Sequence, residues 1–95
     1  MVVLTYDVGT ADKEGAARLQ RVAKLCERYG NRVQKSVFEM KLDAKKLDDI
    51  KLELERTIDH KTDSIRFYRL GNNFEDRISV MGVALPTMEE SLILI

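Results

Sequence analysis

The sequence lacks most of the features that mark secreted, membrane or metal-cluster proteins. Its 95 residues include one cysteine, Cys26, and one proline, Pro86. A lone cysteine excludes a disulfide within the chain and a cysteine-rich zinc site. No apolar run reaches the ~18 residues that a membrane helix needs. The start of the chain has no basic region before its apolar stretch, so we expect no signal peptide, no membrane contact and a cytoplasmic location.

The chain as a whole also has no excess of charge of one sign, but the charges are unevenly distributed along it. Sixteen basic and sixteen acidic residues give a formal net charge of +0, which argues against a strongly basic nucleic-acid binder. The segment 13–35, however, carries seven basic and two acidic residues. This segment can face phosphate while the whole chain stays neutral. The length and the hydrophobic content of 44% predict one small globular domain.

Hydropathy patterns and turn residues predict an alternation of strands and helices. Apolar residues recur at helical spacing over about 13–29 and 44–59. Thr10 or Asp12 is expected to cap the first helix, and Gly30 to end it in a left-handed conformation. Runs rich in β-branched and aromatic residues predict strands at 2–6, in two parts of 32–42 on either side of a bend at 35–36, at 64–70 and at 78–81.

The order β-α-β-β-α-β, with the additional strand after it, predicts a ferredoxin-like α+β fold. In this arrangement both helices cover one face of a mostly antiparallel sheet. We assign this domain to residues 1–82. The remaining segment, 83–95, ends in the apolar run SLILI. That run either pairs with its own sheet or adds to the sheet of a second copy, and we expect the second arrangement, an exchanged strand in a homodimer.

Asp7 is the carboxylate that stands out, because it directly follows an apolar strand and precedes a glycine-containing turn. A carboxylate in that place is a candidate ligand for Mg²⁺, which prefers oxygen ligands. One aspartate is too few for a metal site, but a two-fold axis would supply a second copy. Alternatively, Asp7 caps the turn or the start of the helix, and the residues alone favour this simpler interpretation.

The basic residues of the first predicted helix form a second candidate site. Arg18, Arg21 and Arg28 lie broadly opposite its apolar stripe, and Arg32 begins the next strand. Guanidinium groups bind phosphate oxygens through charge-assisted hydrogen bonds. Any one of these arginines is more often a solvated surface residue, so the suggestion comes from the cluster.

Other polar and aromatic residues are less informative. Tyr6 and Phe38 could stack on bases, but aromatic residues in strands are core residues more often. Ser36 could contact phosphate or simply form the bend. His60 is expected to be a surface bystander, and Cys26 a small buried hydrophobic residue.

Three sequence blocks occur together and in order along the chain. They are VVLTYDV near the start, RLQRVAKLCERYGNRVQKSVFE over 18–39 and DSIRFYRLGN over 63–72. Together these blocks resemble the CRISPR-associated endoribonuclease family, the small subunit of the spacer-acquisition complex. The resemblance covers nearly the whole chain, and the combination is much more specific than any one block.

The resemblance implies a ferredoxin-like homodimer with metal-dependent nuclease activity on single-stranded RNA or, in some members, on double-stranded DNA. It implies that Asp7 is the catalytic residue and that its two copies bind Mg²⁺ across the dimer axis. It also implies a complex with the CRISPR integrase subunit, which inserts spacers into the array. The residues expected to contact nucleic acid are Tyr6, Arg18, Arg21, Arg32, Ser36 and Phe38.

Two hypotheses follow for the activity. In the first, Mg²⁺ held by paired Asp7 carboxylates activates a water that attacks a phosphodiester, while arginines neutralise the phosphate charge. In the second, the protein is a non-catalytic adaptor that binds DNA and bridges integrase dimers. A third possibility, a small-molecule sensor, is disfavoured by the arginine cluster. The effect of replacing Asp7 separates the first two.

Overall fold

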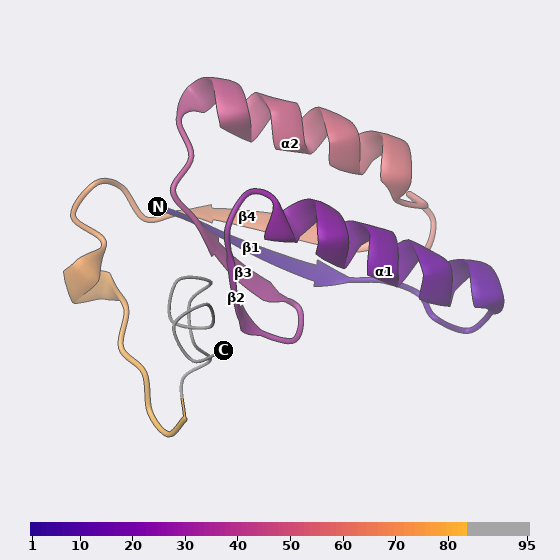
Figure 1. Cartoon of the computed structure of the whole chain (residues 1–95), viewed down its shortest axis with the longest axis horizontal. Coiled ribbons are helices and arrows are strands. Elements are labelled where there is room, and N and C mark those ends of the chain that lie inside the picture. The colour runs from indigo at the N-terminus through magenta and orange to yellow at the C-terminus, as the bar shows by residue number, and fades with distance from the viewer. Residues whose placement is uncertain (84–95) are drawn as a thin grey trace, which may run out of the picture.

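The structure is a computed structural model that describes residues 1–83 of the chain. Four strands and two helices alternate in the predicted order, and a short 3₁₀ helix follows them (Figure 1). The elements are β1 (Val2–Asp7), α1 (Lys13–Glu27), β2 (Asn31–Gln34), β3 (Val37–Met40), α2 (Ala44–Thr57), β4 (Ser64–Arg69) and η1 (Glu75–Arg77).

The four strands form one antiparallel sheet in the order β2-β3-β1-β4. β1 is central, with Leu4 opposite Phe38 of β3 on one side and opposite Phe67 of β4 on the other. Both helices lie side by side across the same face of this sheet (Figure 1). The expected ferredoxin-like α+β fold is therefore confirmed.

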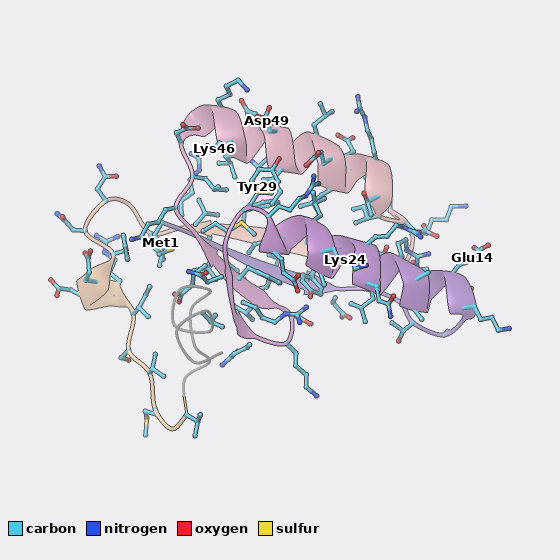
Figure 2. All side chains as sticks on the ribbon, in the orientation of Figure 1. Met1, Glu14, Lys24, Tyr29, Lys46 and Asp49 are labelled. Atoms are coloured by element: carbon cyan, nitrogen blue, oxygen red, sulfur yellow. The ribbon has the colours of Figure 1, made fainter. Side chains whose placement is uncertain are left out.

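The core lies between the sheet and the two helices. Alternate residues of β1 point into it, because successive side chains of a strand face opposite sides. Each helix contributes one apolar stripe, and charged residues such as Glu14 and Lys46 are exposed on the helix surfaces (Figure 2). The buried hydrophobic residues are Val2, Leu4, Tyr6, Val8, Val22, Leu25, Cys26, Phe38, Met40, Leu47, Ile50 and Leu54.

The start of α1 agrees with the prediction, which named two candidate caps, but its end differs. Asp12, rather than Thr10, caps the helix, since its carboxylate accepts a hydrogen bond of 2.8 Å from the Gly15 amide. The helix ends at Glu27, and Gly30 does not adopt the expected left-handed conformation. Gly30 is required for space instead, because a Cβ there would overlap the side chain of Met40.

The predicted bend at residues 35–36 is confirmed as the turn between β2 and β3. The pairing of these strands shifts register between Arg32 and Gln34, which leaves Val33 as an extra residue in β2. This bulge explains the broken alternation in the sequence, because one added residue moves every later side chain to the opposite face.

The prediction of a strand at 78–81 is wrong, because the structure has no strand there. Residues 70–83 contain only the 3₁₀ helix η1 and irregular structure that leads away from the sheet (Figure 1). Val80, Met81 and Val83 are 64%, 96% and 97% exposed. These side chains favour a strand, but a strand also needs an edge with which to exchange backbone hydrogen bonds. This segment pairs with neither edge strand, β2 or β4.

The face of the sheet opposite the helices is not covered by any element within residues 1–83. We call it the open face. It presents Val3 and Thr5 of β1 and Val37 of β3, which are half-buried, together with Tyr68 of β4, which is 45% exposed. It is therefore partly apolar, as a surface that meets another protein would be.

Two further expectations concern the ends of the fold. No helix in the described part of the chain is long and apolar enough to cross a membrane. The predicted SLILI strand at 91–95 lies outside the described residues, so the division into 1–82 and 83–95 stays a prediction.

Candidate functional site

Asp7 lies at a corner of the open face. It is the last residue of β1, is exposed, and pairs with Ser64 at the start of β4. The next pair along these strands on the same face is Thr5 with Arg66. Strand alternation therefore places a carboxylate, a serine and a cationic side chain on one exposed surface.

The chain immediately after Asp7 is held firmly in place. Val8 is buried in the core, and the Gly9 amide donates a hydrogen bond of 3.0 Å to Oδ1 of Asp63. The first turn of α1 packs directly against this loop, because a Cβ at Gly15 would overlap the Gly9 carbonyl oxygen. The strand end that carries Asp7 is thus fixed by the core, by α1 and by the start of β4.

Arg18 forms an ion pair with Asp63 rather than facing solvent. Its Nε lies 2.6 Å from Oδ2 of Asp63, and its Nη2 lies 3.2 Å from Oδ1. The same Nη2 also donates to the Gly9 carbonyl at 3.3 Å and to the Thr62 hydroxyl at 3.2 Å. The side chains are 12% exposed for Arg18 and 0% for Asp63. The guanidinium expected to contact phosphate is therefore already engaged within the protein.

Hydrogen bonding holds the pKa of Asp63 well below its ordinary value of 3.8. The largest cause is the side-chain hydrogen bond from Arg18, and backbone amides of Asp59 and Gly9 contribute in the same direction. Burial opposes them, but its effect is smaller. The carboxylate is therefore charged in the folded protein at all ordinary pH values.

This shift predicts that stability depends on pH at the acid end. A carboxyl whose folded-state pKa is lowered stabilises the fold above its unfolded pKa, and that contribution is lost as pH falls below it. We expect the free energy of unfolding to fall steadily below about pH 4. Asp63→Asn lacks this group, so its stability should change less between pH 5 and pH 3. Urea unfolding at several pH values measures the difference, and equal pH dependence of the two proteins would contradict it.

Tyr6, Arg32 and Phe38 form a second cluster, on the helix side of the sheet. The rings of Tyr6 and Phe38 stack with centroids 6.1 Å apart, and the guanidinium carbon of Arg32 lies 5.2 Å from the Phe38 centroid. The Tyr6 hydroxyl donates to the Lys35 carbonyl at 3.1 Å and accepts from Arg32 at 3.3 Å. Phe38 is 0% exposed. Both rings are core residues, so neither surface is free to stack on a base.

The guanidinium of Arg32 is less fully engaged within the protein than that of Arg18. Its side chain is 38% exposed, and its contact with Glu27 is long at 3.9 Å. Its Nε is buried and has no hydrogen-bond partner within the described residues. Ser36 is half-buried in the adjacent turn, where its carbonyl accepts a hydrogen bond of 3.1 Å from the Tyr6 amide. Arg32 thus lies beside Tyr6 on the side of the sheet away from Asp7, and Ser36 lies in the turn next to Tyr6.

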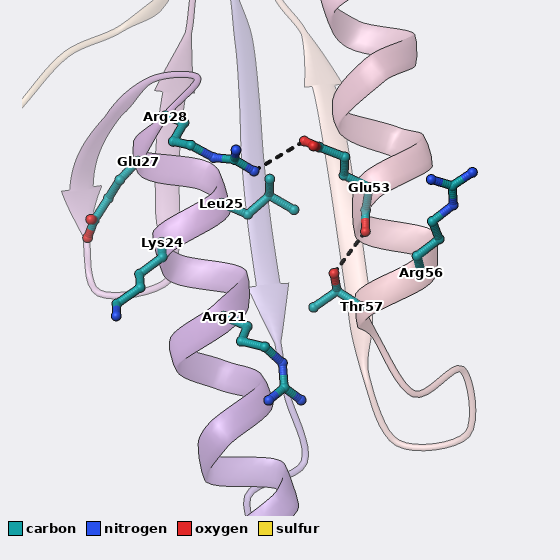
Figure 3. A pocket seen from close by; sticks show the side chains of 8 residues that line it. All are labelled: Arg21, Lys24, Leu25, Glu27, Arg28, Glu53, Arg56 and Thr57. Atoms are coloured by element: carbon teal, nitrogen blue, oxygen red, sulfur yellow. Dashed lines mark hydrogen bonds and ion pairs between the residues drawn. The ribbon is translucent and has the colours of Figure 1, made fainter.

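A basic groove of about 1020 Å³ separates the two helices. Figure 3 shows Leu25 and Arg21 of α1 pointing toward it, while Arg28 reaches across to Glu53 of α2. The Arg28–Glu53 contact is 3.4 Å long and exposed. Arg21 and Lys24 are exposed and have no ion-pair partner in residues 1–83. We call this surface the helix groove.

A metal ion would find an incomplete site in one chain. Within residues 1–83, no three histidine, cysteine, aspartate or glutamate residues are grouped closely enough to hold one. Asp7 offers carboxylate oxygens, which suit Mg²⁺, and Ser64 beside it offers a hydroxyl. The donor chemistry fits Mg²⁺, but the number of ligands fits only if a second chain adds its own.

The two remaining candidates have no place in this chemistry. His60 is exposed in the turn between α2 and β4, as expected. Cys26 is fully buried, and burial raises the pKa of its thiol to about 12. It is therefore neither a nucleophile nor a metal ligand near neutral pH.

Two candidate functional residues, Asp63 and Arg66, were not predicted from the sequence. Asp63 lies 45 residues from Arg18 in the sequence, and no local pattern indicates that pairing. Arg66 could have been recognised from the alternation of β4, which places it on the face opposite Ile65 and Phe67. The structure brings Arg66 onto the face of Asp7, and it places Arg32 and Phe38 on the other side of the sheet. Arg18 lies near the strand end that carries Asp7, but its guanidinium is engaged by Asp63, Gly9 and Thr62.

Comparison with known proteins identifies the family. The sequence profile described as "CRISPR associated protein Cas2" matches residues 1–78. A protein of Halalkalibacterium halodurans named "CRISPR-associated endonuclease Cas2" is 47% identical over 94% of this chain and 92% of its own length. A Rhodospirillum rubrum protein named "CRISPR-associated endoribonuclease Cas2 3" is 45% identical over 94% of this chain and 93% of its own length.

A solved structure shows the same relationship. The crystal structure of Streptococcus pyogenes Cas2 at pH 6.5 superposes with a TM-score of 0.77 and 52% sequence identity, and the match covers 85% of this chain and 98% of that one. Fold, sequence profile and relatives agree with one another and with the resemblance seen in the sequence. The chain therefore belongs to the Cas2 family of CRISPR-associated proteins.

Proposed function

We propose that this protein is a Mg²⁺-dependent endonuclease whose active site forms when two copies pair. The observation that carries the proposal is the position of Asp7, an exposed carboxylate on a firmly held strand end, at the corner of an uncovered and partly apolar sheet face. Relatives named endonuclease and endoribonuclease support nuclease activity on phosphodiester bonds.

Pairing of two chains is supported by the surface that one chain leaves exposed. The open face carries half-buried apolar side chains, and β2 and β4 are both edge strands. Val80, Met81 and Val83 follow β4 and are largely exposed. A second copy would cover these groups and place its own Asp7 across the two-fold axis. A homodimer thus resolves both the apolar exposure and the shortage of metal ligands.

The residues of the paired site have separable roles. The two Asp7 carboxylates would hold the ion, and the Ser64 hydroxyls lie beside them. Mg²⁺, when bound, supplies charge for the phosphate oxygens and lowers the pKa of a coordinated water. Arg66 lies on the same face and can neutralise charge on a phosphate as it builds up during cleavage. The Val8–Gly9 loop keeps Asp7 from moving away from this arrangement.

Substrate binding is assigned to cations that are free to meet phosphate. Arg21 and Lys24 of the helix groove and Arg66 of the open face are exposed. Arg32 is partly exposed and can contribute through the exposed part of its guanidinium, since its Nε is buried. Arg18 is not included, since Asp63 already occupies it. Tyr6 and Phe38 support Arg32 from the core and are not proposed to stack on bases.

Replacing Arg21 should weaken binding to nucleic acid in a salt-dependent way. Loss of one phosphate contact lowers the slope of log affinity against log salt by about one for duplex DNA. Arg21→Ala should therefore bind less tightly at low salt and lose less affinity as salt rises. Lys45→Ala, which removes an exposed cation of α2 that does not line the helix groove, should leave the slope unchanged. Fluorescence anisotropy over a salt series measures both, and an unchanged slope for Arg21→Ala removes it from the binding surface.

The direct test of the proposal is cleavage by the purified protein. Single-stranded RNA and double-stranded DNA are each incubated with the protein, with Mg²⁺ and with excess chelator. We expect the protein to cleave at least one of the two substrates. This cleavage activity should require Mg²⁺ and should elute with the dimer on gel filtration. Cleavage that persists in chelator, or that separates from the protein, would contradict the proposal.

A second function is supported by the position of the helix groove, which lies on the other side of the molecule from Asp7. Arg21 and Lys24 lie on the helix side of the molecule, whereas Asp7 lies on the open face. Nucleic acid bound in the helix groove is therefore not delivered to Asp7 of the same chain. This separation suits an adaptor that holds DNA and bridges CRISPR integrase dimers. If Asp7→Asn retains DNA binding and still supports spacer integration in cells, the adaptor role does not depend on cleavage.

A further inference from the structure

We infer that Asp63 and Arg18 act as a positioning pair that fixes Asp7 for catalysis, an inference that rests on the proposed nuclease function. Neither residue touches substrate in this account. The geometry instead makes them the clamp that holds the end of β1 in place.

The Asp63 carboxylate joins three separate segments of the chain. It accepts hydrogen bonds from Arg18 of α1 at 2.6 and 3.2 Å and from the Gly9 amide at 3.0 Å. It also accepts from the Asp59 amide at 2.8 Å and from the Thr62 hydroxyl at 3.0 Å, both in the turn before β4. A fully buried carboxylate with this many donors is a rigid fixed point.

This fixed point lies next to Asp7 on two sides. Gly9 follows Asp7 by two residues and is held through both its amide and its carbonyl, by Asp63 and by Arg18. Ser64, the residue after Asp63, pairs with Asp7 across the sheet. A movement of the Asp63 carboxylate would therefore act on Asp7 from both sides, through Gly9 along the chain and through Ser64 across the sheet. Displacement of a catalytic group by about 1 Å can lower the rate on the order of 100-fold.

Arg18 fits this role better than phosphate binding. Its Nε and Nη2 already donate to four acceptor atoms in three residues, and its side chain is 12% exposed. To reach a phosphate, it would have to leave the buried Asp63 carboxylate without its partner. Such an exchange is unfavourable, because an unpaired buried charge is strongly destabilising.

The test compares Arg18→Lys, Asp63→Asn and the double variant in full-length dimeric protein. Positioning predicts that each single variant lowers kcat by about tenfold or more with KM and the salt dependence of binding little changed. It also predicts that the double variant is no slower than the slower single variant, because both break the same clamp. A raised KM and a smaller salt slope in Arg18→Lys, with Asp63→Asn unaffected, would instead make Arg18 a phosphate contact and overturn the inference.

Asp49→Asn is the matched control. It makes the same chemical change in an exposed ion pair, Lys45–Asp49, with Nζ 3.1 Å from Oδ2 on the outer surface of α2. Its kcat should equal that of the wild type. An equal loss of kcat in this control would show that the loss in Asp63→Asn is not specific to the clamp, and would overturn the inference.

Hydrogen–deuterium exchange supplies a readout that needs no cleavage. The Gly9 amide should exchange faster in Asp63→Asn and Arg18→Lys, whereas amides of the buried part of α2 should keep the wild-type rate. If the wild type does not cleave at all but exchange changes as stated, the proposed function fails while the clamp stands. Unchanged Gly9 exchange in a folded variant would refute the clamp itself. Should Asp63→Asn fail to fold, Arg18→Lys, which keeps a cation beside Asp63, decides the question alone.

Discussion

Asp7→Asn should lower the rate of Mg²⁺-dependent phosphodiester cleavage by about 100-fold or more. Asparagine keeps the size and the position of the side chain at the exposed end of β1, but it removes the negative charge that binds a divalent cation. In a dimer the substitution removes two ligands at once, one from each chain. A 100-fold loss corresponds to about 2.7 kcal/mol in the activation barrier, within the usual range for loss of electrostatic stabilisation. Initial cleavage rates at saturating Mg²⁺ measure it.

Glu39→Gln is the matched control for this experiment. Glu39 of β3 lies on the same open face and pairs with Val3 of β1. Val3 precedes Asp7 by four residues, which is ~13 Å along the strand. Its cleavage rate should stay within about twofold of the wild type, since loss of a charge on the open face is not enough to disrupt a site at the far corner. If Asp7→Asn, purified in the same way, cleaves as fast as the wild type, then Asp7 is not the catalytic residue and only the adaptor function remains.

Gly15→Ala should destabilise the fold more than any other glycine-to-alanine change in the chain. A helical glycine normally costs stability relative to alanine, so the substitution would be favourable elsewhere. Here the added Cβ would overlap the carbonyl oxygen of Gly9, a backbone atom held by Arg18. We expect the free energy of unfolding to fall by roughly 2–3 kcal/mol, as in overpacked cores. Urea unfolding followed by circular dichroism gives the value.

Gly9→Ala provides the comparison. Its Cβ would approach the Cβ of Thr62 to 3.0 Å, which is a tight contact with a side chain and not an overlap with a backbone atom. The loss of stability should therefore be smaller than for Gly15→Ala. A reversed order of the two variants would mean that α1 does not press on the loop after Asp7 as the structure shows.

Most of the fold could be predicted from the sequence because its signals are local. The apolar stripe of α2 at Leu47, Ile50 and Leu54 and the cap at Asp12 depend only on neighbouring residues. The turn at residues 35–36 follows from the broken alternation between β2 and β3. Each of these features arises within one or two helical turns or one strand pair, which is the range over which periodicity carries information.

The errors arose where structure depends on distant groups. Gly30 looked like a helix terminator, but it is needed because Met40 of β3 approaches its Cα. Residues 78–81 have the composition of a strand, yet pairing is decided by the availability of an edge. The pairing of Arg18 with Asp63 could not be predicted, because Asp63 lies 45 residues away in the sequence. The position of Asp7 was predicted correctly, since it depends only on where β1 ends.

We propose that two chains complete one metal site around a pair of Asp7 carboxylates. A titration of the protein with Mn²⁺, followed by electron paramagnetic resonance and competed with Mg²⁺, measures this most directly. We expect one ion that Mg²⁺ displaces for every two chains of the wild type, and none for Asp7→Asn. One ion bound per chain, or the same binding in the variant, would contradict it.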